Sequence, residues 1–146
     1  MSTAANPQQS GASPEPAPLD WVDGQEAILY EHCGACGKAT YFRRGFCPRC
    51  GATPVAVRRS AGQGTVYAAT TVVRAPSPEW KAIAPYAMVL VDLQEGIRIL
   101  AHGVPGLAIG DAVNIGWHRL GERLIPRAEP VASSTQGQQK NDIRPP

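Results

Sequence analysis

The stretch "HCGACGKATYFRRGFCPRCG", residues 32–51, contains all four cysteines of the 146-residue chain. The cysteines form two Cys-x-x-Cys pairs that are ten residues apart, and a glycine follows each pair. This pattern is typical of a zinc ribbon, in which two tight turns each supply two thiolates to one tetrahedral ion. The sequence therefore predicts one structural Zn²⁺ ion, and the predicted metal ligands are Cys33, Cys36, Cys47 and Cys50.

The residues around the cysteines fit this interpretation. Gly37 and Gly51 follow the second cysteine of each pair, where a positive φ lets backbone N–H groups point at sulfur. The insert "GKATYFRRGF", residues 37–46, has the length of a hairpin arm. We expect its aromatic residues to cover the metal, and these are Tyr41, Phe42 and Phe46.

Other uses of four cysteines are less consistent with the sequence. A thioredoxin-like redox site places one Cys-x-x-Cys at the start of a helix, and no helical pattern follows either pair. Iron in a rubredoxin-like cage takes the same ligands, so a red electron carrier stays an alternative. Four thiolates close the coordination shell, which makes the metal structural and leaves His32 as a neighbour rather than a ligand.

The composition is that of a folded protein with two weakly apolar ends. Apolar residues make up 43% of the chain and charged residues 18%. Residues 1–19 and 131–146 have too little apolar surface to offset the entropy of ordering, so we expect disordered tails there. No leader pattern and no apolar run of about 20 residues is visible, so we expect a cytoplasmic protein without a membrane partner.

Positive charge is concentrated in the middle of the chain. Seven Lys and Arg residues and no acid lie between residues 32 and 78, whereas residues 1–31 carry five acids and no base. A basic segment in a chain of net charge +2 indicates an anionic partner. Alternatively, the cations offset the net charge of −2 that four thiolates give to a Zn²⁺ site.

The second half of the folded region reads as five strands. Residues 65–74 are rich in Thr, Val and Tyr, and residues 86–103 read as two strands joined at Gln94–Gly96. A fourth strand is expected at about 112–119, followed by a turn and a short last strand. Five strands favour a small OB-fold barrel over a sandwich, which needs about seven.

The predicted fold is thus all-β: a rubredoxin-like zinc ribbon followed by a five-stranded OB-fold barrel. Only the segment "LDWVDGQEAILYE", residues 19–31, has some helical character, and Gly24 weakens it. The predicted boundaries are 1–19 for the first tail, 20–60 for the ribbon with its N-terminal segment, 61–130 for the barrel and 131–146 for the last tail.

A catalytic centre is not evident in the sequence. The histidines His32, His102 and His118 are isolated from one another along the chain, and each is interpreted as a surface or core residue. The sequence contains no Gly-x-Ser-x-Gly or His-Glu-x-x-His motif, and no cysteine is left over as a nucleophile. We therefore predict no catalytic residue in this chain.

The ribbon is followed in order by "GQGTVYAATTV", "PYAMVLVDLQEGIRILAHG", "IGDAVNIGW" and "IPRAEP". This ordered set resembles the zinc-ribbon/OB-fold family associated with acyl-CoA enzymes, over roughly residues 28–130. Members of that family are small non-catalytic subunits that pair with thiolase-superfamily proteins, aldolases or hydratases acting on CoA thioesters. Members often have a longer helical segment before the first cysteine, and here that segment is short.

The resemblance implies an accessory subunit of a heteromeric thiolase-type complex that assists assembly and CoA-thioester binding. Benzoylsuccinyl-CoA thiolysis in toluene degradation is one such role. Guanidinium groups pair well with phosphate, so the residues expected to contact the CoA phosphates are Arg43, Arg44, Arg58 and Arg59.

A second hypothesis is a module that binds single-stranded nucleic acid. OB-folds and zinc ribbons both serve this purpose, and the basic segment with Tyr41, Phe42 and Phe46 supplies charge and stacking groups. The net charge of only +2 and the aromatic content of 6% argue against it.

Overall fold

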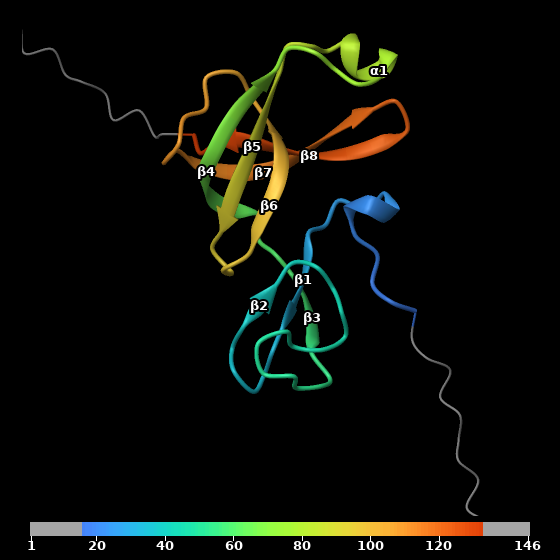
Figure 1. The fold of residues 1–146 in the computed structure, drawn as a ribbon, viewed down its shortest axis with the longest axis vertical. Helices are drawn as coiled ribbons and strands as arrows, with labels where there is room; N and C mark the ends of the chain where they lie inside the picture. Colours follow the sequence, from blue (N-terminus) through green and yellow to red (C-terminus); the bar gives the residue numbers. More distant parts are fainter. Residues whose placement is uncertain (1–15, 133–146) are drawn as a thin grey trace, which may run out of the picture.

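The computed structural model describes residues 16–132 of the chain. A three-stranded sheet is followed by a closed five-stranded barrel, and the two parts stack end to end along the long axis (Figure 1). The predicted all-β fold of ribbon and barrel is therefore confirmed. The elements are the 3₁₀ turn η1 (Trp21–Asp23), β1 (Leu29–His32), β2 (Ala39–Thr40), β3 (Ala56–Arg59), β4 (Gln63–Val72), α1 (Pro78–Lys81), β5 (Tyr86–Leu93), β6 (Arg98–Gly103), β7 (Ala112–Leu120) and β8 (Arg123–Pro130).

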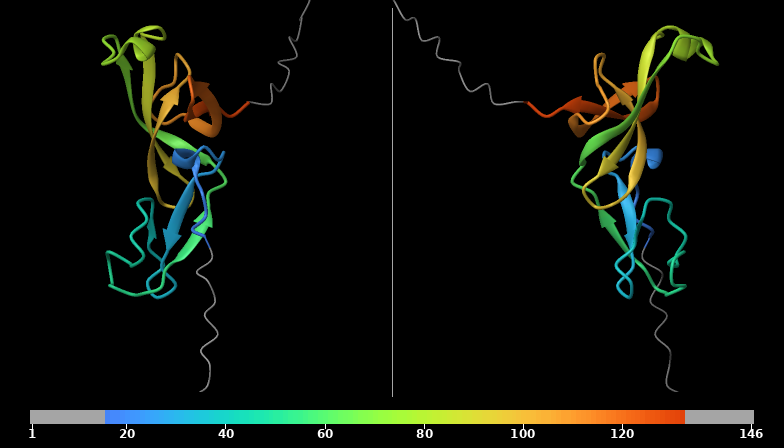
Figure 2. Two further views of the ribbon diagram at one scale, coloured as in Figure 1. Left: turned by 90° about the vertical axis from the view of Figure 1, so that its right-hand side faces the viewer. Right: turned by 60° about the vertical axis from the view of Figure 1, so that its left-hand side comes forward.

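The ribbon sheet has β1 at its centre, with β2 and β3 antiparallel on either side. Before β1, the chain forms only the single turn η1, which lies at the junction of the two parts beside β8 (Figure 2). The Asp20 side chain caps this turn, and Gly24 ends it with a φ of 86°. The left-handed glycine explains why the helical character of this segment extends no further.

The barrel has the strand order β4-β5-β6-β8-β7, and β4 pairs with β7 to close it. The strand β4 contains a register shift between Val66 and Ala68, which is where a long strand bends around the barrel. The last strand β8 is eight residues long and pairs with β7 along its whole length, so the prediction of a short last strand is wrong. In contrast, β8 pairs with β6 at only two positions, His102↔Arg127 and Gly103↔Ala128.

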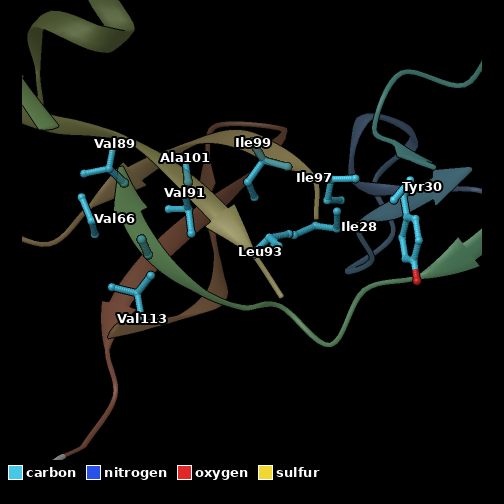
Figure 3. Packing of buried hydrophobic residues seen from close by; sticks show 12 residues of the cluster. Ile28, Tyr30, Val66, Val89, Val91, Leu93, Ile97, Ile99, Ala101 and Val113 are labelled. Atoms are coloured by element: carbon cyan, nitrogen blue, oxygen red, sulfur yellow. The ribbon is translucent and has the colours of Figure 1, made fainter. Parts of the chain in front are cut away.

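One continuous apolar cluster connects the barrel to the ribbon. Val91, Val113 and Ala128 in the barrel are completely buried. Ile28 and Tyr30 extend this cluster toward the ribbon, and Ile28 lies beside Leu93 and Ile97 (Figure 3). The buried base of the ribbon therefore depends on side chains that the barrel supplies.

The remaining segments are short. The helix α1 forms one turn in the proline-rich connection between β4 and β5, at the end of the barrel far from the ribbon (Figure 1). Of the predicted tails, 1–15 and 133–146 lie outside the described residues, and 16–19 and 131–132 have no regular secondary structure. Within residues 16–132, no helix has the length and apolar character needed to cross a membrane.

Candidate metal centre

The structure brings the four cysteine sulfurs together at the end of the ribbon. The four Sγ atoms all lie within 4.8 Å of one another. The Sγ atoms of Cys33 and Cys50 are 3.6 Å apart, and those of Cys36 and Cys47 are 3.5 Å apart. A tetrahedral Zn²⁺ ion with Zn–S bonds of about 2.3 Å requires sulfur separations of about 3.8 Å, whereas a disulfide requires about 2 Å. The donor set and its spacing therefore fit one Zn²⁺ ion.

Each Cys-x-x-Cys pair forms a tight turn that ends in a left-handed glycine. Gly37 has a φ of 73° and donates its N–H to the Cys33 carbonyl at 2.9 Å. Gly51 has a φ of 76° and donates to the Cys47 carbonyl at 2.8 Å. The predicted positive φ at both glycines is confirmed, and a side chain at either position would strain the turn.

Backbone N–H groups in these turns point at sulfur. The Cys36 N–H is the main reason that the pKa of the Cys33 thiol is lowered. The Cys50 N–H plays the same part at Cys47 and lowers the pKa of that thiol to about 6. At Cys50, the Ala52 N–H lowers the pKa, but the nearby Cys33 and Cys36 sulfurs outweigh it and raise the pKa to about 12. Four thiols with such interactions lose their protons together only when a cation compensates their charge.

A buried carboxylate holds the arm between the two turns. Glu31 is only 4% exposed, although it lies in the centre of β1. Its carboxylate accepts the backbone N–H of Arg44 at 2.9 Å and that of Gly45 at 2.8 Å. Because a buried charge is costly unless it is hydrogen-bonded, these contacts fix the position of the arm relative to β1.

The aromatic residues of the arm differ in burial and in their partners. The Tyr41 hydroxyl accepts the indole N–H of Trp21 at 2.8 Å, which joins the arm to the N-terminal turn. Phe42 is 70% exposed and Phe46 is 45% exposed. Phe42 and Phe46 therefore keep much of their surface in solvent, and the covering of the metal by the three rings stays a prediction.

The four arginines predicted to contact CoA fall into two groups. Arg43 forms an ion pair with Asp20 at 3.1 Å and also donates to the Pro18 carbonyl. Arg59 donates to the Glu26 carbonyl at 2.7 Å. Arg44 and Arg58 are exposed and form no ion pair with any residue of the described part of the chain. Two guanidinium groups therefore have structural partners, and two are available for an external anion.

Two of the histidines come together in a cluster that the sequence does not reveal. The rings of His102 and His118 lie 5.1 Å apart, and the His102 ring stacks on Tyr86 at 5.0 Å. Trp80 meets the same imidazole edge-on. His32 ends β1 and directly precedes the first cysteine, and its buried Nδ1 atom has no hydrogen-bond partner among residues 16–132. No spacing in the sequence predicts the His102–His118 contact, because the barrel has to close before these strands meet.

The fold and the closed four-thiolate site define a zinc-ribbon/OB-fold protein. Residues 21–56 match the ChsH2 rubredoxin-like zinc ribbon domain, and residues 57–118 match the ChsH2 C-terminal OB-fold domain. This chain belongs to the ChsH2 (DUF35) family of zinc-ribbon/OB-fold proteins.

Two curated proteins are similar to this chain. A DUF35 domain-containing scaffold protein of Methanothermobacter thermautotrophicus is 30% identical over 95 residues, which cover 62% of this chain and 71% of that protein. A probable enoyl-CoA hydratase alpha subunit of Thermomonospora curvata is 32% identical over 92 residues, or 63% of this chain. The match spans only 28% of the hydratase subunit.

Two solved structures are similar as well. A chain of the Ltp2-ChsH2(DUF35) aldolase has a TM-score of 0.65 and 28% identity, and the match covers 80% of this chain and 98% of that chain. A DUF35 protein of unknown function from Sulfolobus solfataricus has a TM-score of 0.50 and 16% identity, with 70% of this chain and 76% of that chain covered. This second match supports the fold alone.

Proposed function

We propose that this chain is a non-catalytic, zinc-binding accessory subunit of a heteromeric enzyme complex that acts on CoA thioesters. The similarity to the chain in the Ltp2-ChsH2(DUF35) aldolase carries this proposal, because it covers 98% of that chain. The name of the Methanothermobacter relative, a scaffold protein, and that of the hydratase alpha subunit point in the same direction.

The metal in this proposal is Zn²⁺, and its ligands are Cys33, Cys36, Cys47 and Cys50. Four thiolates leave no coordination position for a substrate, so the ion holds the ribbon in shape and takes no part in the reaction. A metal measurement tests this assignment. We expect one equivalent of zinc and no visible absorption, whereas a red protein would indicate iron.

The catalytic partner is proposed to be a thiolase-superfamily subunit in a complex that breaks or forms carbon–carbon bonds in acyl-CoA substrates. Benzoylsuccinyl-CoA thiolysis in toluene degradation is the proposed example. The relatives support a partner that acts on CoA thioesters, and their names include an aldolase and an enoyl-CoA hydratase subunit. These two classes are therefore the alternatives against which a thiolase has to be compared.

Contact with the CoA phosphates is proposed for all four arginines, and first of all for Arg44 and Arg58, because the side chains of Arg43 and Arg59 already have partners within the chain. Arg44 and Arg58 are exposed and lie on the arm and on β3. Arg43 and Arg59 already donate to Pro18, Asp20 and Glu26, so part of each guanidinium group is occupied. Within the described part of the chain, Arg44 and Arg58 keep all of their guanidinium donors for a phosphate, which favours the first pair.

Co-expression tests the partner. This chain is produced with each thiolase, aldolase and hydratase encoded beside its gene, and complexes are detected by size-exclusion chromatography with light scattering. We expect one stable complex whose thioester turnover exceeds that of the catalytic subunit alone, and no turnover by this chain. A chain that stays monomeric beside every candidate, or that turns over a thioester unaided, would contradict the proposal.

The arginine assignment is tested in the same complex. Replacing Arg44 and Arg58 with alanine is expected to raise KM for the CoA thioester several-fold and to leave kcat nearly unchanged, because a lost phosphate contact weakens ground-state and transition-state binding alike. Arg74→Ala is the matched control, since Arg74 is also an exposed arginine of the basic segment. An equal KM in both variants would exclude this phosphate contact.

A further inference from the structure

A pocket of about 610 Å³ opens between η1, β6 and β8. It lies where β6 and β8 stop pairing with each other. The β6–β8 pairing ends at His102↔Arg127, and the pocket is lined by the residues just beyond it, including Leu100 and Ile125. This volume is within the range of about 300 to 1,000 Å³ that is common for small-molecule sites.

The walls of the pocket are mainly apolar. Trp21 and Trp80 face it from the N-terminal turn and from α1, and Met88 and Leu100 contribute from β5 and β6. The Trp21 indole N–H is already donated to Tyr41, so this residue offers the pocket an apolar ring. The body of any molecule that binds here is therefore expected to be apolar.

The charged residues of the lining lie at the mouth and carry both signs. Asp23, Glu122 and Arg123 are all exposed. Because neither sign dominates, the pocket has no feature that selects an anion such as a phosphate. This distinguishes it from the exposed arginines of the ribbon.

One buried polar side chain reaches the pocket without a partner. His102 is only 7% exposed, and its side chain forms no hydrogen bond with any residue between 16 and 132. Its ring nitrogens are not sealed, unlike the Nε2 of His118, and the residue lines the pocket. Burial, and then the nearby His118 and Arg127, lower the pKa of His102, which favours the neutral imidazole. A neutral imidazole offers one donor and one acceptor.

We propose that this pocket binds an uncharged, mainly apolar molecule with one carbonyl or hydroxyl oxygen, and that His102 forms the hydrogen bond to that oxygen. The apolar walls select the body of the ligand, and the buried imidazole selects its polar atom. A hydrocarbon in the pocket would cover the imidazole nitrogen and leave it without a hydrogen bond, which costs free energy, so a ligand that pairs with it is favoured over a pure hydrocarbon of the same shape.

The test uses the full-length, zinc-loaded chain and two matched probes. The ketone 4-phenyl-2-butanone and the hydrocarbon butylbenzene share a ring and a four-carbon chain, but only the ketone has an oxygen. Each is titrated into ¹⁵N-labelled protein and followed by NMR. We expect saturable shifts at the Trp21 and Trp80 indole N–H groups and, for the ketone, at the His102 imidazole.

Variants separate the hydrogen bond from simple partition into an apolar site. His102→Phe keeps a stacked ring and removes the nitrogens, so it is expected to weaken ketone binding about 2- to 10-fold and to leave butylbenzene binding unchanged. Leu100→Glu puts a charge at the mouth and is expected to abolish binding of both probes. Ile109→Glu is its control, since Ile109 is also exposed and lies away from the pocket.

Three outcomes would overturn the proposal. The first is shifts that spread over other exposed apolar residues such as Phe42, or that do not saturate. The second is an equal loss of ketone and butylbenzene affinity in His102→Phe. If that variant does not fold, the corresponding outcome is that Leu100→Glu and Ile109→Glu bind the ketone with equal affinity. The third is loss of ketone binding in the complex with the catalytic subunit, which would identify a partner side chain as the occupant. The first two outcomes concern the chain alone, so they leave the proposed accessory function untouched.

Discussion

The two halves of the molecule solve the problem of stability in different ways. The barrel buries Val91, Val113 and Ala128 completely. The ribbon has an edge strand, β3, in which all four residues are exposed. Among the most deeply buried side chains of the ribbon are two of the proposed metal ligands, Cys33 and Cys47, each 2% exposed. In the ribbon, the proposed bonds from sulfur to zinc would take the place that apolar contacts occupy in the barrel.

The ribbon and the barrel contribute unequally to the apolar cluster that they share. Of the twelve residues of the shared cluster, only Ile28, Tyr30 and Ala39 precede the barrel. A barrel that supplies most of its own core is expected to fold without the ribbon's metal. A ribbon with so little core is expected to need both the metal and the barrel.

The largest effect is expected from the loss of one metal ligand. Cys47→Ser should abolish stoichiometric zinc binding and unfold the ribbon, because the metal contributes on the order of 10 kcal/mol to small zinc modules. The barrel should stay folded. In an NMR spectrum, the amide signals of residues 29–59 should collapse to random-coil positions while those of residues 63–130 persist.

Ala35→Ser is the control for this experiment. Ala35 lies in the first Cys-x-x-Cys turn and is exposed, so the added hydroxyl should leave zinc binding and both sets of signals intact. If the barrel signals also disappear in Cys47→Ser, the two halves form one cooperative unit and the asymmetry is wrong.

A smaller effect is expected from a cavity in the barrel core. Val91→Ala removes two carbon atoms from a completely buried site, which should lower the free energy of unfolding by about 2 kcal/mol. Urea denaturation followed by circular dichroism measures this loss, and zinc stoichiometry should not change. Val73→Ala is the matched control, since Val73 is 71% exposed and should be nearly neutral. Similar midpoints for the two variants would show that Val91 does not support the core.

These two regions also differ in how well the sequence predicts them. The clustering of the four cysteines could be predicted because each Cys-x-x-Cys pair is local, and because Gly37 and Gly51 mark the turn that each pair requires. The five barrel strands could be predicted because glycines and prolines separate runs of Val, Ile and Thr. Each of these two predictions depends on residues that lie close to one another along the chain.

Contacts that depend on closure of the fold could not be predicted. His102 and His118 lie on β6 and β7, which meet only across β8. Arg43 is available for phosphate in the sequence, but the N-terminal segment folds back and pairs it with Asp20. Nothing in the sequence distinguishes Glu31 from an exposed acid in a strand, and only the folded arm supplies its hydrogen-bond donors. The sequence contains each of these residues, but the partner of each lies far away along the chain.

Glu31 holds the arm between the two Cys-x-x-Cys turns through the backbone N–H groups of Arg44 and Gly45. Glu31→Gln replaces one acceptor oxygen with an NH₂ donor that faces a backbone N–H, since both carboxylate oxygens accept from Arg44 N–H. We expect a loss of about 1 to 3 kcal/mol, confined to the ribbon. Faster amide exchange at Arg44 and Gly45 and faster removal of zinc by a chelator would measure it. Glu26→Gln, an exposed change, should alter neither rate.

The smallest effect is expected in the connection between ribbon and barrel, where a side chain of the barrel binds residues 60 and 61. Glu95, in the β5–β6 turn, accepts the Ser60 hydroxyl at 2.9 Å and the Ala61 N–H at 2.7 Å. Glu95→Gln keeps one acceptor oxygen, so the expected loss is about 0.5 to 1.5 kcal/mol, with Glu79→Gln as the exposed control. Because Ser60 and Ala61 lie between the two halves, the loss should appear as faster amide exchange at residues 60–62 with unchanged zinc affinity and an unchanged barrel. A drop in zinc affinity instead would mean that the barrel positions the metal site through this connection. The ribbon and the barrel would then be more strongly coupled than their separate cores suggest.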